Sequence, residues 1–170
     1  MPRFVSKCIT ARTASSRSLD AIKSDVVRLD RRVFGGRRSY DAPFSKPTWE
    51  AIWQSSKRIT YVFHTKSAEV IAYLSVEISG PRKFYIATIG VDIGARHQGL
   101  ATRLLRRLER RKFDTISLHV AVINQSAIAF YERNGFVVTR RVRHYYGRND
   151  DALYMQKHRL PLAPKKRGKL

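Results

Sequence analysis

The stretch that decides the fold is residues 118–136, which read LHVAVINQSAIAFYERNGF. Its apolar and β-branched start predicts a strand over residues 115–122, and the pattern that follows predicts a helix over residues 125–134. Asn124 is placed to cap the start of this helix, and Gly135 is placed to end it in the left-handed conformation. Strand, cap, helix and stop follow one another within a short segment, which is typical of an α/β domain.

A second informative stretch lies upstream, at residues 91–101, which read VDIGARHQGLA. It joins an expected strand over residues 82–92 to a helix that begins at Gly99. The N–H groups at a helix N-terminus and the helix dipole favour a bound phosphate, and Arg96 adds a positive charge. Gly99 and Ala101 are small enough for a ligand to approach the backbone. The glycine spacing fits neither a P-loop nor a Rossmann fingerprint, and an ordinary exposed turn is the alternative.

The rest of the chain predicts further elements without internal repeats. Apolar residues at spacings of three and four predict a helix over residues 19–33, capped by Ser18. The other predicted elements are a strand over 4–12, a loop over 37–47, a short helix capped by Thr48, and strands over 58–64, 69–79, 136–145 and 152–158. The three consecutive strands over 58–64, 69–79 and 82–92 predict an antiparallel meander. The later strand–helix–strand order predicts parallel pairing inside a mixed sheet. We expect one domain over residues 1–160 and a disordered basic tail over 161–170.

The bulk composition limits the class of protein. A chain of 170 residues with 43% hydrophobic content is expected to fold as one domain with a core. The formal net charge of +21 predicts attraction to polyanions such as nucleic-acid phosphates, and a merely basic surface is the alternative. The single cysteine, Cys8, excludes an internal disulfide, and no metal is expected. We expect a cytoplasmic protein, with a mitochondrial transit peptide in the basic first eighteen residues as the alternative.

Together, these stretches resemble the GNAT superfamily of acetyltransferases. The pyrophosphate signature of that family, R-x-x-G-x-G/A, is carried here by Arg96, Gly99 and Ala101. The run over residues 118–136 resembles NatE-type N-terminal acetyltransferases and, more distantly, bacterial RimI. The likeness covers residues 19–158. It implies a GNAT fold, with a mixed and mostly antiparallel central sheet, a splayed parallel pair in its middle, and flanking helices.

The resemblance implies acetyl-CoA as the co-substrate. It implies that Asn124 binds the pantetheine arm and that Tyr131 places its hydroxyl near the sulfur. The alternatives are pure capping for Asn124 and core packing for Tyr131. The residues that the resemblance assigns to the coenzyme are Ile89, Gly90, Val91, Arg96, His97, Gln98, Gly99, Leu100, Ala101, Thr102, Asn124, Ala127, Phe130 and Tyr131.

The same resemblance assigns the base to Tyr85 and His119, acting through an ordered water. An α-amino group has a pKa of about 7.7–8.0, so a histidine that titrates near neutral pH suits its deprotonation. RimI-like enzymes carry a glutamate at the position of His119, so the histidine favours the NatE-like branch. A structural role is the alternative for each residue. The residues implied for peptide binding are Phe34, Tyr40, Ala87, Tyr145 and Tyr146.

One segment departs from the family pattern. Where the family has a Pro-Val pair after the phenylalanine, this chain has Gly35-Gly36, which predicts a more flexible loop. The departure puts the usual preference for methionine followed by a hydrophobic residue in doubt. Two other functions stay open: acetylation of lysine side chains or small amines, and a non-catalytic GNAT-fold protein that binds RNA or the ribosome.

Two groups of basic residues bear on partners. The buried leucines of the helix after Gly99 predict that its arginines face solvent. Ribosomes or ribosomal RNA are therefore expected partners besides peptide and protein N-termini, and a solvated surface is the alternative. An auxiliary acetyltransferase subunit is a further expected partner, and no membrane is expected. The basic residues are Arg103, Arg106, Arg107, Arg110, Arg111 and Lys112 on the helix, and Arg140, Arg141, Arg143, His144 and Arg148 on the late hairpin.

Overall fold

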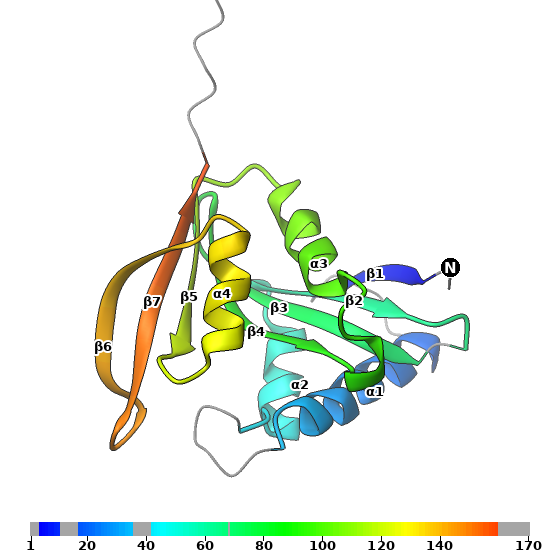
Figure 1. Cartoon of the computed structure of the whole chain (residues 1–170). Helices are drawn as coiled ribbons and strands as arrows, with labels where there is room; N and C mark the ends of the chain where they lie inside the picture. Colours follow the sequence, from blue (N-terminus) through cyan, green and yellow to red (C-terminus); the bar gives the residue numbers. More distant parts are fainter. Residues whose placement is uncertain (1–3, 11–16, 36–41, 68, 160–170) are drawn as a thin grey trace, which may run out of the picture.

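The structure is a computed structural model that describes residues 4–10, 17–35, 42–67 and 69–159. The elements are β1 (Val5–Ile9), α1 (Arg17–Val33), α2 (Lys46–Gln54), β2 (Arg58–His64), β3 (Val70–Gly80), β4 (Lys83–Val91), the 3₁₀ turn η2 (Ile93–Ala95), α3 (Leu100–Glu109), β5 (Thr115–Ala121), α4 (Gln125–Arg133), β6 (Val137–Gly147) and β7 (Asp150–His158). In this part of the chain, seven strands form one sheet in the order β1-β2-β3-β4-β5-β7-β6 (Figure 1). Among them only β4 and β5 pair in parallel.

This architecture confirms the predicted fold class, and most predicted boundaries lie close to the observed ones. The predicted cap of α2 is wrong. The helix begins at Lys46, and Ser45 caps it by accepting a hydrogen bond from the backbone N–H of Thr48 at 3.2 Å. Pro47 lies in the first turn, where proline is favoured because its missing N–H has no helical partner. The helix therefore starts one turn earlier than the tryptophan spacing indicated.

Three other predictions concern ends of elements. α1 begins at Arg17, so the predicted cap Ser18 lies inside the helix. β1 ends at Ile9, which is shorter than the predicted strand over residues 4–12, and residues 11–12 lie outside the described residues. The predicted tail over residues 161–170 also lies outside the described residues.

The helices divide the apolar core into two clusters, one on each face of the sheet. α1 and α2 cover the first cluster, which contains Leu19, Ile22, Val26, Leu29, Trp49 and Tyr73. α3 and α4 cover the second, in which the four leucines of α3 (Leu100, Leu104, Leu105, Leu108) are buried as predicted. Full burial of a side chain of this size contributes about 1.5–3 kcal/mol. Helical layers on both faces therefore hold the middle of the sheet (Figure 1).

The basic residues of α3 and of the turn after it are exposed to solvent as predicted, except Arg107, which is half-buried. Arg103 lies over the ring of Phe63 at 4.7 Å, and Arg107 lies 6.0 Å from the ring of Tyr61. The Nε of Arg111 donates to the Tyr61 hydroxyl at 2.6 Å. A long side chain can lay its stem and planar head along apolar surface, and these three do so on β2. Arg106, Arg110 and Lys112 complete the exposed basic residues of this region.

β4 and β5 separate in the middle of the sheet, as the resemblance implied. Their pairing stops at Ile86 and Leu118, although β4 continues to Val91 and β5 to Ala121. The residues on either side of Ala87 pair with consecutive residues of β3, so Ala87 is the extra residue of a β-bulge. A bulge bends its strand, and this one lies where the pairing with β5 ends. The later part of β4 therefore diverges from β5.

Gly90 lies at a point of β4 where no side chain fits. A Cβ atom there would lie 2.5 Å from Cε1 of Tyr73, a buried residue whose hydroxyl donates to Asp30. We expect Gly90→Ala to lower the free energy of unfolding by about 1–3 kcal/mol, because the ring must move away from its partner. Urea unfolding measures this loss. Gly94→Ala is the matched control, since its Cβ would meet only Asp92 at 3.5 Å, and equal losses in the two variants would contradict the prediction.

Candidate active site

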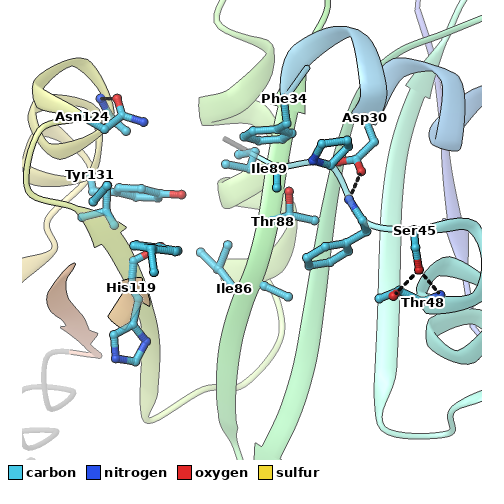
Figure 2. A pocket seen from close by; sticks show the side chains of 18 residues that line it. Asp30, Phe34, Ser45, Thr48, Ile86, Thr88, Ile89, His119, Asn124 and Tyr131 are labelled. Carbon is cyan, nitrogen blue, oxygen red and sulfur yellow. Dashed lines mark hydrogen bonds between the residues drawn. The ribbon is translucent and has the colours of Figure 1, made fainter. Parts of the chain in front are cut away.

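A cavity of about 450 Å³ lies between the splayed strands and the segment that joins α1 to α2. Figure 2 shows His119, Tyr131 and Asn124 on one side of it, facing Ile86 and Ile89 of β4 across the opening. The lining residues come from α1, the segment after it and the start of α2 (Asp30, Phe34, Pro43, Phe44, Thr48), from β4 (residues 86–89), from β5 and α4 (His119, Asn124, Ala127, Tyr131), and from β6 (Tyr146). The cavity therefore brings residues from four regions of the sequence together.

Tyr85 of β4 and His119 of β5 meet at one end of this cavity. The Tyr85 hydroxyl lies 3.0 Å from Nδ1 of His119 and 3.2 Å from the hydroxyl of Tyr145. The Tyr145 ring stacks on the imidazole with centroids 4.0 Å apart and planes at 10°. The Tyr146 hydroxyl donates to the backbone oxygen of His119 at 3.2 Å. The hairpin of β6 and β7 therefore holds the imidazole from one side, and Tyr85 holds it from the other.

Burial shifts the two pKa values in opposite directions. Burial, followed by the positive charge of Arg140, lowers the pKa of His119 below its ordinary value. Burial, followed by the neighbouring Tyr145 hydroxyl, raises the pKa of Tyr85 far above its ordinary value. At neutral pH the imidazole is therefore neutral and can accept a proton, while the Tyr85 phenol keeps its own. Chemically, the pair is a proton acceptor oriented by a phenol.

Asn124 and Tyr131 have the structural roles that the sequence allowed for them, and both also line the cavity. Asn124 caps α4, because its Oδ1 accepts from the backbone N–H of Ala127 at 3.2 Å, and it also lines the cavity. Tyr131 is 6% exposed and packs between Phe130 and Phe136. Its hydroxyl nevertheless points into the cavity (Figure 2), and burial raises its pKa well above the ordinary value. A capping amide and a buried phenol therefore face the same space.

The turn between β4 and α3 has an open, left-handed backbone. Gly99 caps α3 with a φ of 71°, and no heavy atom lies within 4 Å of the position that its Cβ would take. Gly99 is thus required by the backbone conformation and not by a neighbouring protein atom. The side chain of Asp92 orders the start of the turn by accepting from the N–H of Gly94 at 3.0 Å. The exposed N-terminus of α3 is of the kind that binds phosphate.

The predicted coenzyme residues fall into three groups in the structure. Four of them line the cavity: Ile89, Asn124, Ala127 and Tyr131. Arg96, His97, Gln98, Gly99, Leu100, Ala101 and Thr102 form the turn and the first residues of α3, beyond the end of β4. Gly90, Val91 and Phe130 do not line the cavity; Gly90 is buried against Tyr73, and Phe130 packs on Tyr131 at the edge of the core.

The predicted peptide-binding residues are only partly brought together. Phe34, Ala87 and Tyr146 line the cavity. Tyr145 does not line it and instead contacts Tyr85 and His119. Tyr40 lies outside the described residues. The wall that sequence reasoning did not predict is formed by Pro43, Phe44 and Thr48, which follow the undescribed segment and line the end of the cavity away from α4.

Asp30 is the first of two important carboxylates that sequence reasoning missed. It is 1% exposed, and it accepts hydrogen bonds from the backbone N–H of Phe44 at 2.7 Å, from Nε1 of Trp49 at 3.2 Å and from the Tyr73 hydroxyl. Asp30 thus joins α1, α2, β3 and the cavity wall. The sequence held one signal that Asp30 is buried: it lies four residues after Val26, on the apolar face of the helix.

Asp151 is the second important carboxylate that sequence reasoning missed. Its carboxylate accepts from the backbone N–H of His144 at 2.9 Å and from Nε of Arg141 at 2.7 Å, and these donors lower its pKa. His144 has a φ of 53°, a conformation that needs local support. Asp151 therefore stabilises the bend in β6 that directs Tyr145 and Tyr146 toward β5.

Among the described residues, no three His, Cys, Asp or Glu side chains gather in a way that would hold a metal ion. Within the same residues, no helix is both long and apolar enough to span a bilayer.

Two features define the class of the protein. The sheet opens between its two parallel strands, and the turn after the first of these strands is of the kind that binds phosphate. The model of the acetyltransferase (GNAT) family matches residues 26–136, and the chain belongs to this family. N-alpha-acetyltransferase 50 of Danio rerio is 36% identical over 91 residues, which are 49% of this chain and 54% of the relative. The chain thus matches about half the length of this curated relative.

Two solved structures share the fold over nearly the whole chain. The ribosomal-protein-S18-alanine N-acetyltransferase of Escherichia coli is 22% identical, with a TM-score of 0.71 over 95% of this chain and 98% of that one. NAA60 of Arabidopsis thaliana, in complex with a bisubstrate analogue, is 16% identical, with a TM-score of 0.72 over 92% of this chain and 98% of that one. At these identities the likeness establishes the fold alone.

Proposed function

We propose that this protein transfers the acetyl group of acetyl-CoA to the α-amino group of a polypeptide. The observation that carries the proposal is the contact between Tyr85 and His119 at 3.0 Å, beside the cavity between the splayed strands. The relative from Danio rerio is an N-alpha-acetyltransferase, and the similar Escherichia coli structure is an alanine N-acetyltransferase of a ribosomal protein, which supports an amine at a protein N-terminus as the acceptor.

The residues present are suited to acetyl-CoA as the co-substrate. The N-terminus of α3, with Gly99 and Arg96, offers N–H groups and charge to the pyrophosphate. The gap between β4 and β5 would take the pantetheine arm, and the amide of Asn124 lies beside it. The divergence of β4 from β5 after Ile86 makes room for this arm within the sheet.

The proposed chemistry is a direct transfer. His119 accepts a proton from the acceptor ammonium through a water, and Tyr85 orients the imidazole by its hydrogen bond. The amine nitrogen then bonds to the thioester carbon, and the carbon–sulfur bond breaks after the tetrahedral intermediate. A backbone N–H of residues 89–91 would stabilise the oxyanion. Tyr131, whose raised pKa keeps it a phenol, would donate a proton to the departing thiolate. Because burial raises the pKa of Tyr85, His119 alone serves as the proton acceptor.

The pH dependence of kcat/KM tests this assignment. Protonated His119 cannot accept a proton, so kcat/KM should fall at low pH as His119 becomes protonated. Because the pKa of His119 is lowered, the midpoint of this fall (the histidine limb of the profile) should lie below about pH 6.5, the ordinary histidine value. No second rise is expected near about pH 7.7–8.0, where a free α-amine loses its proton, because His119 removes that proton from the bound ammonium. Release of free coenzyme A thiol, followed across pH, measures the profile. A histidine limb above the ordinary value would contradict the assignment.

The experiment that tests the function is acetyl transfer to a peptide panel, read by mass spectrometry. Half of the peptides have a free N-terminus and no lysine; the other half have a blocked N-terminus and one lysine. We expect acetylation of the first set. Modification of the second set alone would replace the proposal with lysine acetylation, which requires deprotonation of an amine with a pKa of about 10.4. The absence of transfer to both sets would favour a non-catalytic role.

We further propose that three exposed basic residues on α3 and in the turn after it, Arg106, Arg110 and Lys112, attract the protein to ribosomal RNA. The formal net charge of +21 supports this, and acetylation of emerging chains would benefit from it. Filter binding to ribosomes should show an affinity that falls steeply with salt. Replacing the three residues with glutamine should weaken binding at every salt concentration and flatten its salt dependence. An affinity that does not depend on salt would overturn the proposal.

A further inference from the structure

Arg140 places a positive charge in the same row of paired residues as His119, across the three strands β5, β7 and β6. His119 of β5 is paired with Tyr154 of β7, and Tyr154 is paired in turn with Arg140 of β6. Paired positions lie on the same face of a sheet. The next residues along, Leu118 and Met155, belong to the core cluster under α3 and α4, so the row lies on the opposite face. The row places an arginine on the same side of the sheet as the proposed base.

The contacts in this row direct the arginine toward the site. The guanidinium of Arg140 lies 4.8 Å from the Tyr154 ring centroid, and that centroid lies 4.8 Å from the imidazole of His119. A cation–π contact of this kind holds the guanidinium over the ring. Arg140 is therefore held on the His119 side of β6.

The charge of Arg140 is not neutralised within the described part of the chain. Its neighbour Arg141 pairs with Asp151 at 2.7 Å, whereas the described residues form no ion pair with Arg140. Arg140 is also exposed to solvent. An exposed guanidinium without a carboxylate partner can bind an incoming carboxylate through two parallel hydrogen bonds.

Strand spacing fixes which part of an acceptor would reach this charge. Neighbouring strands lie about 4.8 Å apart, so Arg140, two strands from His119, is about 10 Å from it. An extended peptide advances about 3.3 Å per residue. A peptide whose amine lies at His119 and which crosses β7 therefore passes Arg140 with its third or fourth residue.

We propose that Arg140 selects acceptor peptides with an aspartate or glutamate at the third or fourth position. This inference rests on the N-terminal acetyltransferase function proposed above. The net charge of the protein favours any acidic peptide, but a single arginine two strands from the base adds a dependence on position.

A carboxylate bound at Arg140 should also alter the proposed base. The positive charge of Arg140 contributes to the lowered pKa of His119, so neutralising that charge raises it. The other groups that contact His119 are phenols: Tyr85, Tyr145, Tyr146 and Tyr154. Acidic peptides should therefore show their histidine limb at a higher pH than neutral peptides do.

The test is a set of lysine-free peptides that carry one aspartate at the second, third, fourth or fifth position, with an all-neutral peptide as the reference. At low salt, kcat/KM should be about fivefold higher for aspartate at the third or fourth position, the size of one exposed charge pair. High salt should reduce this preference. Arg140→Ala should remove the dependence on position, and Arg140→Glu should favour arginine at the same position. Arg133→Ala, which removes an exposed charge from α4, is the matched control and should keep the preference.

The outcomes separate this inference from the function on which it rests. Efficient acetylation of the neutral peptide with equal rates for all aspartate positions would overturn the inference and leave the function standing. A preference that survives in Arg140→Ala would assign it to the overall charge and would also overturn the inference. The absence of transfer to every peptide would overturn both.

Discussion

Alanine in place of His119 should lower kcat for peptide acetylation by about 100- to 10,000-fold, the range that general-base catalysis contributes. The imidazole is the only group at this end of the cavity, among the described residues, that is both in reach of Tyr85 and held neutral by a lowered pKa. Tyr85→Phe should cost less, about tenfold, because it removes the hydrogen bonds of one hydroxyl to His119 and Tyr145 and leaves the proton acceptor in place.

Single-turnover acetylation of a free-amine peptide measures these losses. The control is the affinity for acetyl-CoA, which should stay close to that of the wild type because the turn before α3 and Asn124 lie on other elements. Thermal unfolding of both variants checks that the loss of activity is not caused by a loss of folding. A His119→Ala enzyme with nearly the wild-type kcat would limit His119 to packing and reopen the choice of base.

The fold was predictable because its signals are local. The strand, cap, helix and stop over residues 118–136 interact with neighbours along the chain, so the elements of the structure there follow the prediction closely. The separation of β4 from β5 came only from the resemblance. Its physical cause, the bulge at Ala87, depends on pairing with β3, which no local pattern in β4 reports.

The site was less predictable because its supports are distant in sequence. The resemblance paired Tyr85 with His119, and the structure brings them into contact, but the stacking of Tyr145 on His119 arises from the bend in β6. That bend depends on Asp151, a carboxylate whose role sequence spacing does not reveal. The resemblance assigned Gly90 to the coenzyme, and the structure adds a second reason for a glycine there, because the ring of Tyr73 in the next strand leaves no room for a side chain.

Asp30 is expected to be highly sensitive to substitution, because its carboxylate is buried and accepts three hydrogen bonds. Asp30→Ala would leave three donors without their acceptor inside the protein: the N–H of Phe44, Nε1 of Trp49 and the Tyr73 hydroxyl. Removing one partner of a buried charged network costs about 3–5 kcal/mol, a large part of the roughly 5–15 kcal/mol that holds a domain folded. Urea unfolding should therefore show a much lower midpoint with an unchanged slope.

Asp30→Asn separates the charge from the hydrogen bonds. The amide oxygen can accept from Phe44 and Trp49 while the Tyr73 hydroxyl turns to accept from the amide, so the loss should be smaller than for alanine. Burial raises the pKa of Asp30, so the folded protein holds this proton more tightly than the unfolded chain does. Wild-type stability should consequently fall, relative to Asp30→Asn, as pH rises from the ordinary aspartate value of about 3.9 through the raised one. If wild-type stability instead rose relative to Asp30→Asn as the pH increased, the wall of the cavity would require the charged carboxylate itself.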